Sequence, residues 1–249
     1  MKYYKALALF FSALAFLAMS TVAHAAGQVV VASTSLTGAI AKAAGAHEVR
    51  ILTPADVGHP PEYDLKPTDL IKLEGADVVV YAGYERMVSR LAETSRNKQI
   101  RVVQVDTTLS PENLIAQVRK VAVALKTEKE AGVWERSFLQ TLNTLKSKLA
   151  PLAEKRAVVH WHARPFATWA GLNVVQAIPL GELTPRIIAD SIALKPDVVV
   201  DIAHSPVAKT IADNAKCKYV QIINFPGVEK TKSLEDIFEY NTNQLLKAF

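Results

Sequence analysis

The sequence predicts an α/β fold in which two lobes of parallel-rich sheet with flanking helices are joined by one long spine helix. Short β-branched runs alternate with helical segments in two stretches of the chain, and a long amphipathic pattern separates these stretches. The runs are apolar throughout, which is typical of parallel strands covered on both faces. These observations divide the chain into an N-terminal lobe at 26–110, connecting helices at 111–155 and a C-terminal lobe at 156–249.

Residues 1–25 are typical of a secretory signal peptide. A positive end containing Lys2 and Lys5 precedes an apolar core from Ala6 to Met19. Ala23-His24-Ala25 then fits a small-x-small cleavage site. The apolar stretch is short for a membrane span, although a retained N-terminal anchor is the alternative reading. Export predicts a periplasmic or other extracytoplasmic location.

Charge and cysteine content exclude several classes of protein. The formal charge of the whole chain is +5, and removal of Lys2 and Lys5 with the signal lowers it to +3. The positive residues are scattered, so we expect no nucleic-acid partner. Cys217 is the only cysteine, which excludes an internal disulfide and a cysteine-based zinc site.

The N-terminal lobe is expected to contain four strands, at Val29–Ser33, Glu48–Leu52, Val78–Tyr81 and Arg101–Val105. Two helices are expected beside them, one at Gly38–Ala44 and a second from Pro67 to near Gly75. Between the second strand and the second helix, the segment 53–63 fits neither a helix nor a strand. Two prolines directly after His59 restrict the backbone there, so we expect a stiff loop that presents one imidazole.

The connecting region contains two helical patterns. Ser110-Pro111-Glu112 is a strong helix start, with a serine cap, proline in the first turn and an acid near the N-terminus. A second pattern has apolar residues three or four apart: Trp134, Phe138, Leu142, Leu145, Leu149 and Leu152. It predicts an amphipathic helix of about 25 residues, or roughly 37 Å.

The C-terminal lobe repeats the build of the first. Its strands are expected at Val158–His160, Asn173–Ala177, Val198–Asp201 and Tyr219–Ile223. An Asp-Val-Val-Val run at 77–80 follows a helix opened by Pro67, and the same run at 197–200 follows a helix opened by Pro185. Ligands of such sheets bind beyond the carboxyl ends of the strands, so two facing lobes predict a site in the cleft between them.

Imidazole and carboxylate groups are predicted to converge on that cleft. His160 and His162 flank Trp161, and strand alternation would place both imidazoles on one side. The other candidates are His59 and Asp106 from the first lobe and Asp201 and His204 from the second. This donor set suits zinc, and also manganese or iron. The alternative is that each histidine is an ordinary surface or capping residue.

Several motifs resemble the zinc/manganese-type periplasmic solute-binding proteins of bacterial metal ABC importers. The strongest is the run from Gly58 to Leu70, with the sequence Gly-His-Pro-Pro-Glu-Tyr-Asp-Leu-Lys-Pro-Thr-Asp-Leu. Ser-Pro-Glu-Asn at 110–113, His160 with the later Gly-Leu at 171–172, and Asp201 with Ser-Pro at 205–206 resemble further segments. The resemblance covers essentially the whole mature sequence, and it implies that His59 and His160 bind the metal.

The sequence also departs from that family. Asp106 stands where the family usually has a histidine, and Asn224 stands where it often has an aspartate. His162 and His204 are additional, so one of them is a candidate replacement ligand. After the third strand, Tyr84 and Glu85 either line the cleft or, in the case of Glu85 with Arg86, form a solvated pair.

The resemblance implies a monomeric binding protein, not an enzyme, whose cargo is a divalent transition metal. It would capture zinc or manganese and deliver the ion to the membrane permease of an ABC importer. Two alternatives remain at this level: a binding protein of the same build for a metal chelate, and a metal-dependent hydrolase. The sequence contains no HExxH or Gly-x-Ser-x-Gly motif for the latter.

Overall fold

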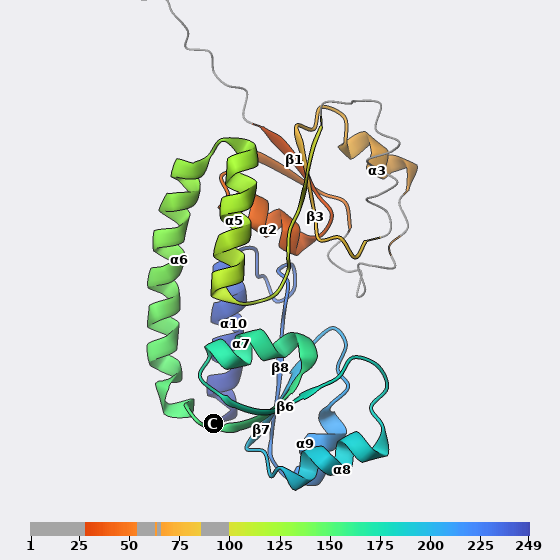
Figure 1. Cartoon of the computed structure of the whole chain (residues 1–249), viewed down its shortest axis with the longest axis vertical. Helices are drawn as coiled ribbons and strands as arrows, with labels where there is room; N and C mark the ends of the chain where they lie inside the picture. The colour runs from red at the N-terminus through yellow and green to blue at the C-terminus, as the bar shows by residue number, and fades with distance from the viewer. Residues whose placement is uncertain (1–27, 54–62, 64–65, 86–99) are drawn as a thin grey trace, which may run out of the picture.

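Two four-stranded sheets form the centres of two lobes, which lie one above the other in Figure 1. The computed structural model describes residues 28–53, 63, 66–85 and 100–249. The strand orders are β2-β1-β3-β4 and β6-β5-β7-β8, and every pairing in both sheets is parallel. The predicted fold class is confirmed. The predicted signal peptide at 1–25 lies outside the described residues, and no helix within them is long and apolar enough to cross a membrane.

The first sheet is built from β1 (Val29–Ala32), β2 (Glu48–Ile51), β3 (Val78–Tyr81) and β4 (Arg101–Gln104), with α2 (Ser35–Ala43) and α3 (Pro67–Lys72). Helix α2 begins three residues before the predicted start because Thr34 caps it. The Thr34 hydroxyl accepts from the Thr37 amide, and the Thr37 hydroxyl oxygen accepts from the Thr34 amide. This reciprocal capping satisfies N–H groups that a helix start otherwise leaves without partners.

The second sheet is built from β5 (Arg156–His160), β6 (Asn173–Ile178), β7 (Val198–Ile202) and β8 (Lys218–Ile222). Its helical segments are η3 (Trp161–Ala163), α7 (Arg164–Trp169), α8 (Pro185–Ala193), α9 (Lys209–Ala215) and α10 (Leu234–Ala248). Figure 1 draws α7, which follows β5, on the side of this lobe that faces the first lobe.

The repeated Asp-Val-Val-Val run has the same structural role in each lobe. The Asp77 carboxylate accepts from the Val29 amide at the start of β1, at 2.8 Å. The Asp197 carboxylate accepts from the Arg156 amide at the start of β5, also at 2.8 Å. In both sheets the aspartate therefore satisfies the first amide of the neighbouring central strand, while the valines that follow it are buried.

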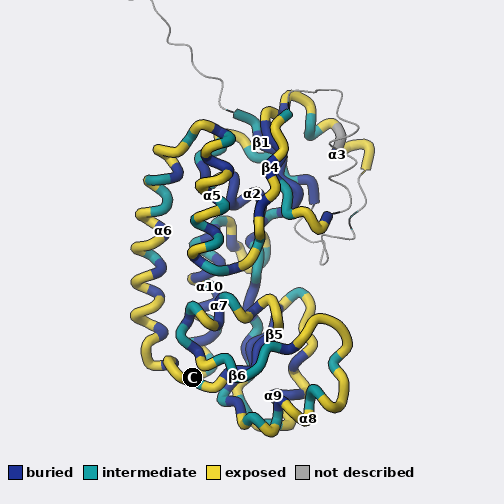
Figure 2. Tube along the Cα trace, in the orientation of Figure 1, coloured by how far each residue is buried: buried dark blue, intermediate teal, exposed yellow. Residues whose placement is uncertain are grey.

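Helices α5 (Pro111–Leu125) and α6 (Glu128–Leu149) connect the lobes, and η2 (Ala150–Leu152) continues α6. Ser110 caps α5 as predicted, because its hydroxyl accepts from the Asn113 amide at 3.3 Å. The buried face of α6 packs on α10, where the rings of Phe138 and Phe238 meet edge to face at 5.6 Å. One continuous core extends from the first sheet through α2, α5, α6 and α10 to the second, as the buried segments in Figure 2 show.

The predicted strand end at His160 is confirmed, but the strand alternation expected to relate His160 and His162 is wrong. Strand β5 ends at His160, and residues Trp161–Ala163 form a turn of 3₁₀-helix. The turn begins there because the His160 side chain accepts the His162 amide hydrogen at Nδ1, at 3.2 Å, as an N-cap residue does. Side chains at 160 and 162 are therefore not related by strand alternation, although their rings remain close.

Candidate metal site

The His160–His162 pair is the centre of the candidate site in the second lobe. The two ring centroids are 5.5 Å apart, with 34° between the planes. Two imidazoles that bind one tetrahedral ion at about 2.0 Å have centroids about 5 Å apart. The observed separation is therefore compatible with a shared ion. His160 is 8% exposed, whereas His162 is exposed to solvent.

Both rings of this pair favour the neutral form. Burial lowers the pKa of His160 below its ordinary value of 6.5; the Asp201 carboxylate opposes the shift, and His162 adds to it. Burial also lowers the pKa of His162. A neutral imidazole keeps the lone pair that a metal ligand requires.

Asp201 lies on the strand next to His160 but directs its carboxylate to the protein itself. It is fully buried, and one oxygen accepts from the Val207 amide at 2.9 Å, the Ala208 amide at 2.7 Å and the Tyr219 hydroxyl at 2.9 Å. The other oxygen accepts from the Ile202 amide at 2.9 Å. These four bonds hold the loop between β7 and α9, and the carboxylate acts on His160 through its charge.

His204 and Asn224 follow the next two strands along the sheet. His204 lies in the loop after β7, and its ring centroid is 5.0 Å from that of Phe225, in the segment after β8. The side-chain oxygen of the adjacent Asn224 is buried and has no hydrogen-bond partner among the described residues. A buried amide oxygen without a donor costs free energy unless a ligand or water satisfies it. Asn224 thus keeps a buried oxygen without a donor just after β8.

His59 falls outside the described residues, but both ends of its segment are held. Upstream, the Thr53 amide donates to the Ser33 carbonyl at 3.1 Å, which fixes the chain at the carboxyl edge of the first sheet. Downstream, the buried Asp69 carboxylate accepts from the Tyr63 hydroxyl at 2.8 Å and the Lys66 amide at 3.0 Å. The Pro-rich segment therefore leaves and rejoins the described part of the lobe at fixed points.

Asp106 is exposed in the loop between β4 and α5. Its carboxylate accepts from the Thr108 amide at 2.8 Å, and its carbonyl accepts from the Asn113 side chain at 3.0 Å. The Asp106 amide donates to the Gln117 side chain at 3.2 Å. These contacts attach the loop to the first turns of α5 and hold Asp106 at the end of β4.

Glu85 has a structural role that the sequence left open, and the reading as a solvated pair is wrong. Its side chain is 4% exposed and accepts from the Ser33 hydroxyl at 2.5 Å and the Gly83 amide at 2.7 Å. Beside it, burial and then the Glu85 charge raise the pKa of Tyr84 to about 12, and Tyr84 bonds the side chains of Thr34 and Thr107. The residues after β1, β3 and β4 are thereby tied together at one edge of the sheet.

Within the described ranges, no three His, Cys, Asp or Glu side chains are grouped so that they could hold a metal ion. The structure brings His160 and His162 together and places Asp201 near them. It positions His204 and Asp106 on their predicted loops, after β7 and β4.

Comparison with known proteins gives the same family that the motifs indicate. Residues 30–131 match the family described as zinc-uptake complex component A, periplasmic (ZnuA), which confirms the resemblance over that part of the chain. Among curated proteins, none matches the chain.

Solved structures share the two-lobed fold over most of the chain. A periplasmic metal-binding protein from Candidatus Liberibacter asiaticus is 16% identical, with a TM-score of 0.70 over 89% of this chain and 99% of that one. The Mn-bound form of that protein is 15% identical, with a TM-score of 0.69 over 88% of this chain and 98% of that one. The solute-binding protein FpvC from Pseudomonas aeruginosa, in complex with Mn2+, is 18% identical, with a TM-score of 0.68 over 89% of this chain and 98% of that one.

Proposed function

We propose that this chain is an extracytoplasmic solute-binding protein that captures a divalent transition metal, zinc or manganese, between its lobes. It then delivers the ion to the permease of an ABC importer. The family match over residues 30–131 and the shared fold with Mn-bound binding proteins support this assignment. The single observation that carries it is the His160–His162 pair, two imidazoles whose ring centroids are 5.5 Å apart and whose pKa values are lowered by desolvation.

We further propose a division of labour among the candidate residues. His160 and His162 supply imidazoles from the second lobe, and His59 supplies one from the first. His204 and Asp106 complete the shell from the loops after β7 and β4. Asp201, whose carboxylate already accepts four hydrogen bonds, positions this region and favours a cation near His160 through its negative charge.

Bound metal would rearrange one hydrogen bond at His160. In the metal-free arrangement Nδ1 accepts from the His162 amide, so a neutral ring carries its proton on Nε2. A metal at Nε2 requires that proton to move to Nδ1, which removes the acceptor, and a metal at Nδ1 displaces the amide directly. The His162 amide therefore loses this partner in either mode, and capture of the ion is coupled to the start of the 3₁₀ turn.

The protein is proposed to act by binding alone, as a monomer exported by its N-terminal signal. The donor set is imidazole-rich and is drawn from two lobes, which favours a closed shell around a transported ion. A hydrolytic metal site keeps an open position beside a general base, and the sequence offers no motif of that kind.

The test is the metal content of the purified mature protein, followed by competition titration with zinc and manganese. His160→Ala should weaken binding by more than the ~10–100-fold that loss of an outer-shell partner costs. His47→Ala is the matched control, because His47 is exposed just before β2 and should leave affinity unchanged. Wild-type affinity in His160→Ala would overturn the proposal. Unchanged affinity in both His162→Ala and His204→Ala would exclude the additional histidines as ligands.

A further inference from the structure

Strand β8 lies at the edge of the second sheet, and its outer side is partly open. Within the described residues it pairs only with β7. The Lys218 amide donates to the Asp197 carbonyl at 3.1 Å, and the Ile222 carbonyl accepts from the Ala203 amide at 2.9 Å. Because backbone groups alternate in direction along a strand, Tyr219, Gln221 and Ile223 direct theirs away from β7.

Asn241 on α10 already satisfies one of these outward positions. Its side-chain oxygen accepts from the Ile223 amide, and its side-chain nitrogen donates to the Ile223 carbonyl, both at 2.8 Å. A residue of a neighbouring antiparallel strand would make the same two hydrogen bonds to Ile223. The Asn241 side chain that makes them is fully buried. The protein thus protects the edge at Ile223, while the outward groups of Tyr219 and Gln221 face a groove.

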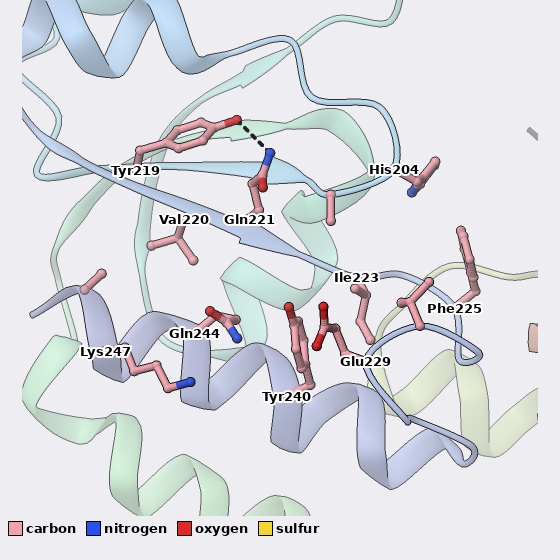
Figure 3. A pocket seen from close by; sticks show the side chains of 13 residues that line it. His204, Tyr219, Val220, Gln221, Ile223, Phe225, Glu229, Tyr240, Gln244 and Lys247 are labelled. Atoms are coloured by element: carbon pink, nitrogen blue, oxygen red, sulfur yellow. Dashed lines mark hydrogen bonds between the residues drawn. The ribbon is translucent and has the colours of Figure 1, made fainter. Parts of the chain in front are cut away.

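The groove runs between β8 and α10 and has a volume of about 590 Å³. Side chains from both faces of the strand border it: Figure 3 shows Tyr219 and Gln221 on one side and Val220 turned towards α10 on the other. The strand therefore presents its edge to the groove. The volume is within the range of about 300–1,000 Å³ that is usual for small-ligand sites.

Opposite charges mark the two ends of this groove. Figure 3 shows Lys247 at the end where β8 begins and Glu229, beside Tyr240, at the end where it finishes. Burial and then the Glu229 charge raise the pKa of Tyr240, which agrees with this placement. Tyr240 and Lys247 are seven residues apart on α10, or roughly 10 Å at 1.5 Å per residue. That distance fits three to four residues of extended peptide at about 3.3 Å each.

We propose that this groove binds a short extended peptide, which adds to the edge of β8 as an antiparallel strand. Its carboxylate lies at Lys247 and its amino group at Glu229, so the peptide runs opposite to β8. Its backbone pairs with the outward N–H and C=O groups of Tyr219 and Gln221, as in other complexes formed by strand addition. Among the described candidate metal ligands, only His204 borders this groove.

The probe is a mixture of tetrapeptides with free ends, randomised at every position and added to the isotope-labelled mature protein. We expect the NMR amide signals of Tyr219 and Gln221 to shift, while that of Ile223, already bonded to Asn241, moves less. Lys247→Gln and Glu229→Gln should each weaken binding about threefold to fivefold, the effect of one partly exposed ion pair. Lys146→Gln on the exposed face of α6 is the control and should bind as the wild type does.

A second peptide mixture with acetylated N-termini and amidated C-termini checks the orientation. It should bind more weakly to the wild type and lose its sensitivity to both substitutions. Unmoved Tyr219 and Gln221 signals at millimolar peptide, or equal binding by the wild type, Lys247→Gln and Glu229→Gln, would overturn the proposal. Zinc titration of the same samples should be unchanged in both variants, so failure here is distinct from failure of metal binding.

Discussion

Replacing Asp201 separates a positioning role from a role as metal ligand. The side chain is fully buried and accepts three backbone amide hydrogens and the Tyr219 hydroxyl hydrogen. Asp201→Ala leaves all four donors without that acceptor. A buried donor without a partner costs about 1–3 kcal/mol, and water entering the space left by the carboxylate recovers part of this. We therefore expect a loss of about 3–5 kcal/mol in the free energy of unfolding.

Asp201→Asn provides a graded comparison. The amide keeps one oxygen, which can accept from Val207, Ala208 and Tyr219, but it turns an N–H₂ group towards the Ile202 amide. The expected loss is about 1–2 kcal/mol, since one donor loses its acceptor and faces another donor. Asp213→Ala is the control, because Asp213 is exposed on α9 and its ion pair with Lys209 contributes only about 0.3–0.5 kcal/mol.

The assay is urea unfolding of the three variants and the wild type with a chelator present, so that metal binding does not contribute. If Asp201 served mainly as a metal ligand, its carboxylate would repel the other ligand atoms when no metal is bound. Its removal would then leave the free energy of unfolding unchanged or higher. If the free energy of unfolding of metal-free Asp201→Ala is within about 1 kcal/mol of the wild-type value, the positioning role is refuted.

The further predictions concern the histidine pair and two glycines of the backbone. On addition of zinc, the NMR amide signal of His162 should move strongly as its bond to His160 Nδ1 breaks; an unmoved signal would exclude His160 as a ligand. Because burial lowers the pKa of both histidines below 6.5, zinc affinity should persist as pH falls to about 6.5 and drop at lower pH. The same lowered pKa values mean that the unfolded chain binds protons first, so metal-free stability should also fall as pH decreases below 6.5. Competition titration and unfolding between pH 7.5 and 5 measure both effects, and affinity that falls already above pH 7 would contradict the shifts. Gly45→Ala should destabilise by about 1–3 kcal/mol, because φ is +94° and the new Cβ would lie 2.9 Å from Cβ of Glu130. In Gly132→Ala, within α6, the new Cβ would meet only Arg136 Nη1 at 3.9 Å, so it should stabilise by about 1 kcal/mol in thermal unfolding.

The order of strands and helices was predictable because each depends on short-range patterning. The runs around Val78–Tyr81 and Val198–Ile202 are apolar and β-branched, and they are buried central strands in the two sheets. The cap at Ser110 and the apolar spacing from Phe138 to Leu149 likewise gave a start for α5 and the buried face of α6. Element ends shifted by a few residues where a side chain competes with the backbone, as Thr34 does at the start of α2.

The arrangement of the candidate site was less predictable. A histidine, a variable residue and a second histidine after a valine run fit a strand, yet the His160 ring accepts the His162 amide hydrogen and begins a turn. The isolated Glu85 likewise gave no sign that Ser33, about fifty positions earlier in the chain, would donate to it. Such contacts depend on which loops meet at the edge of a sheet, and this is set by strand order.

The sequence by itself determined the class of fold, the two-lobed division and the residue types available to a cation, because periodicity, prolines and imidazoles are local properties. Tertiary structure decided what each of those groups does. It brought four donors to the Asp201 carboxylate, lowered the pKa of His160 and His162 through partial desolvation, and left part of the β8 edge open beside α10. Desolvation and hydrogen bonding depend on neighbours that are distant in the chain, so no local pattern specifies them.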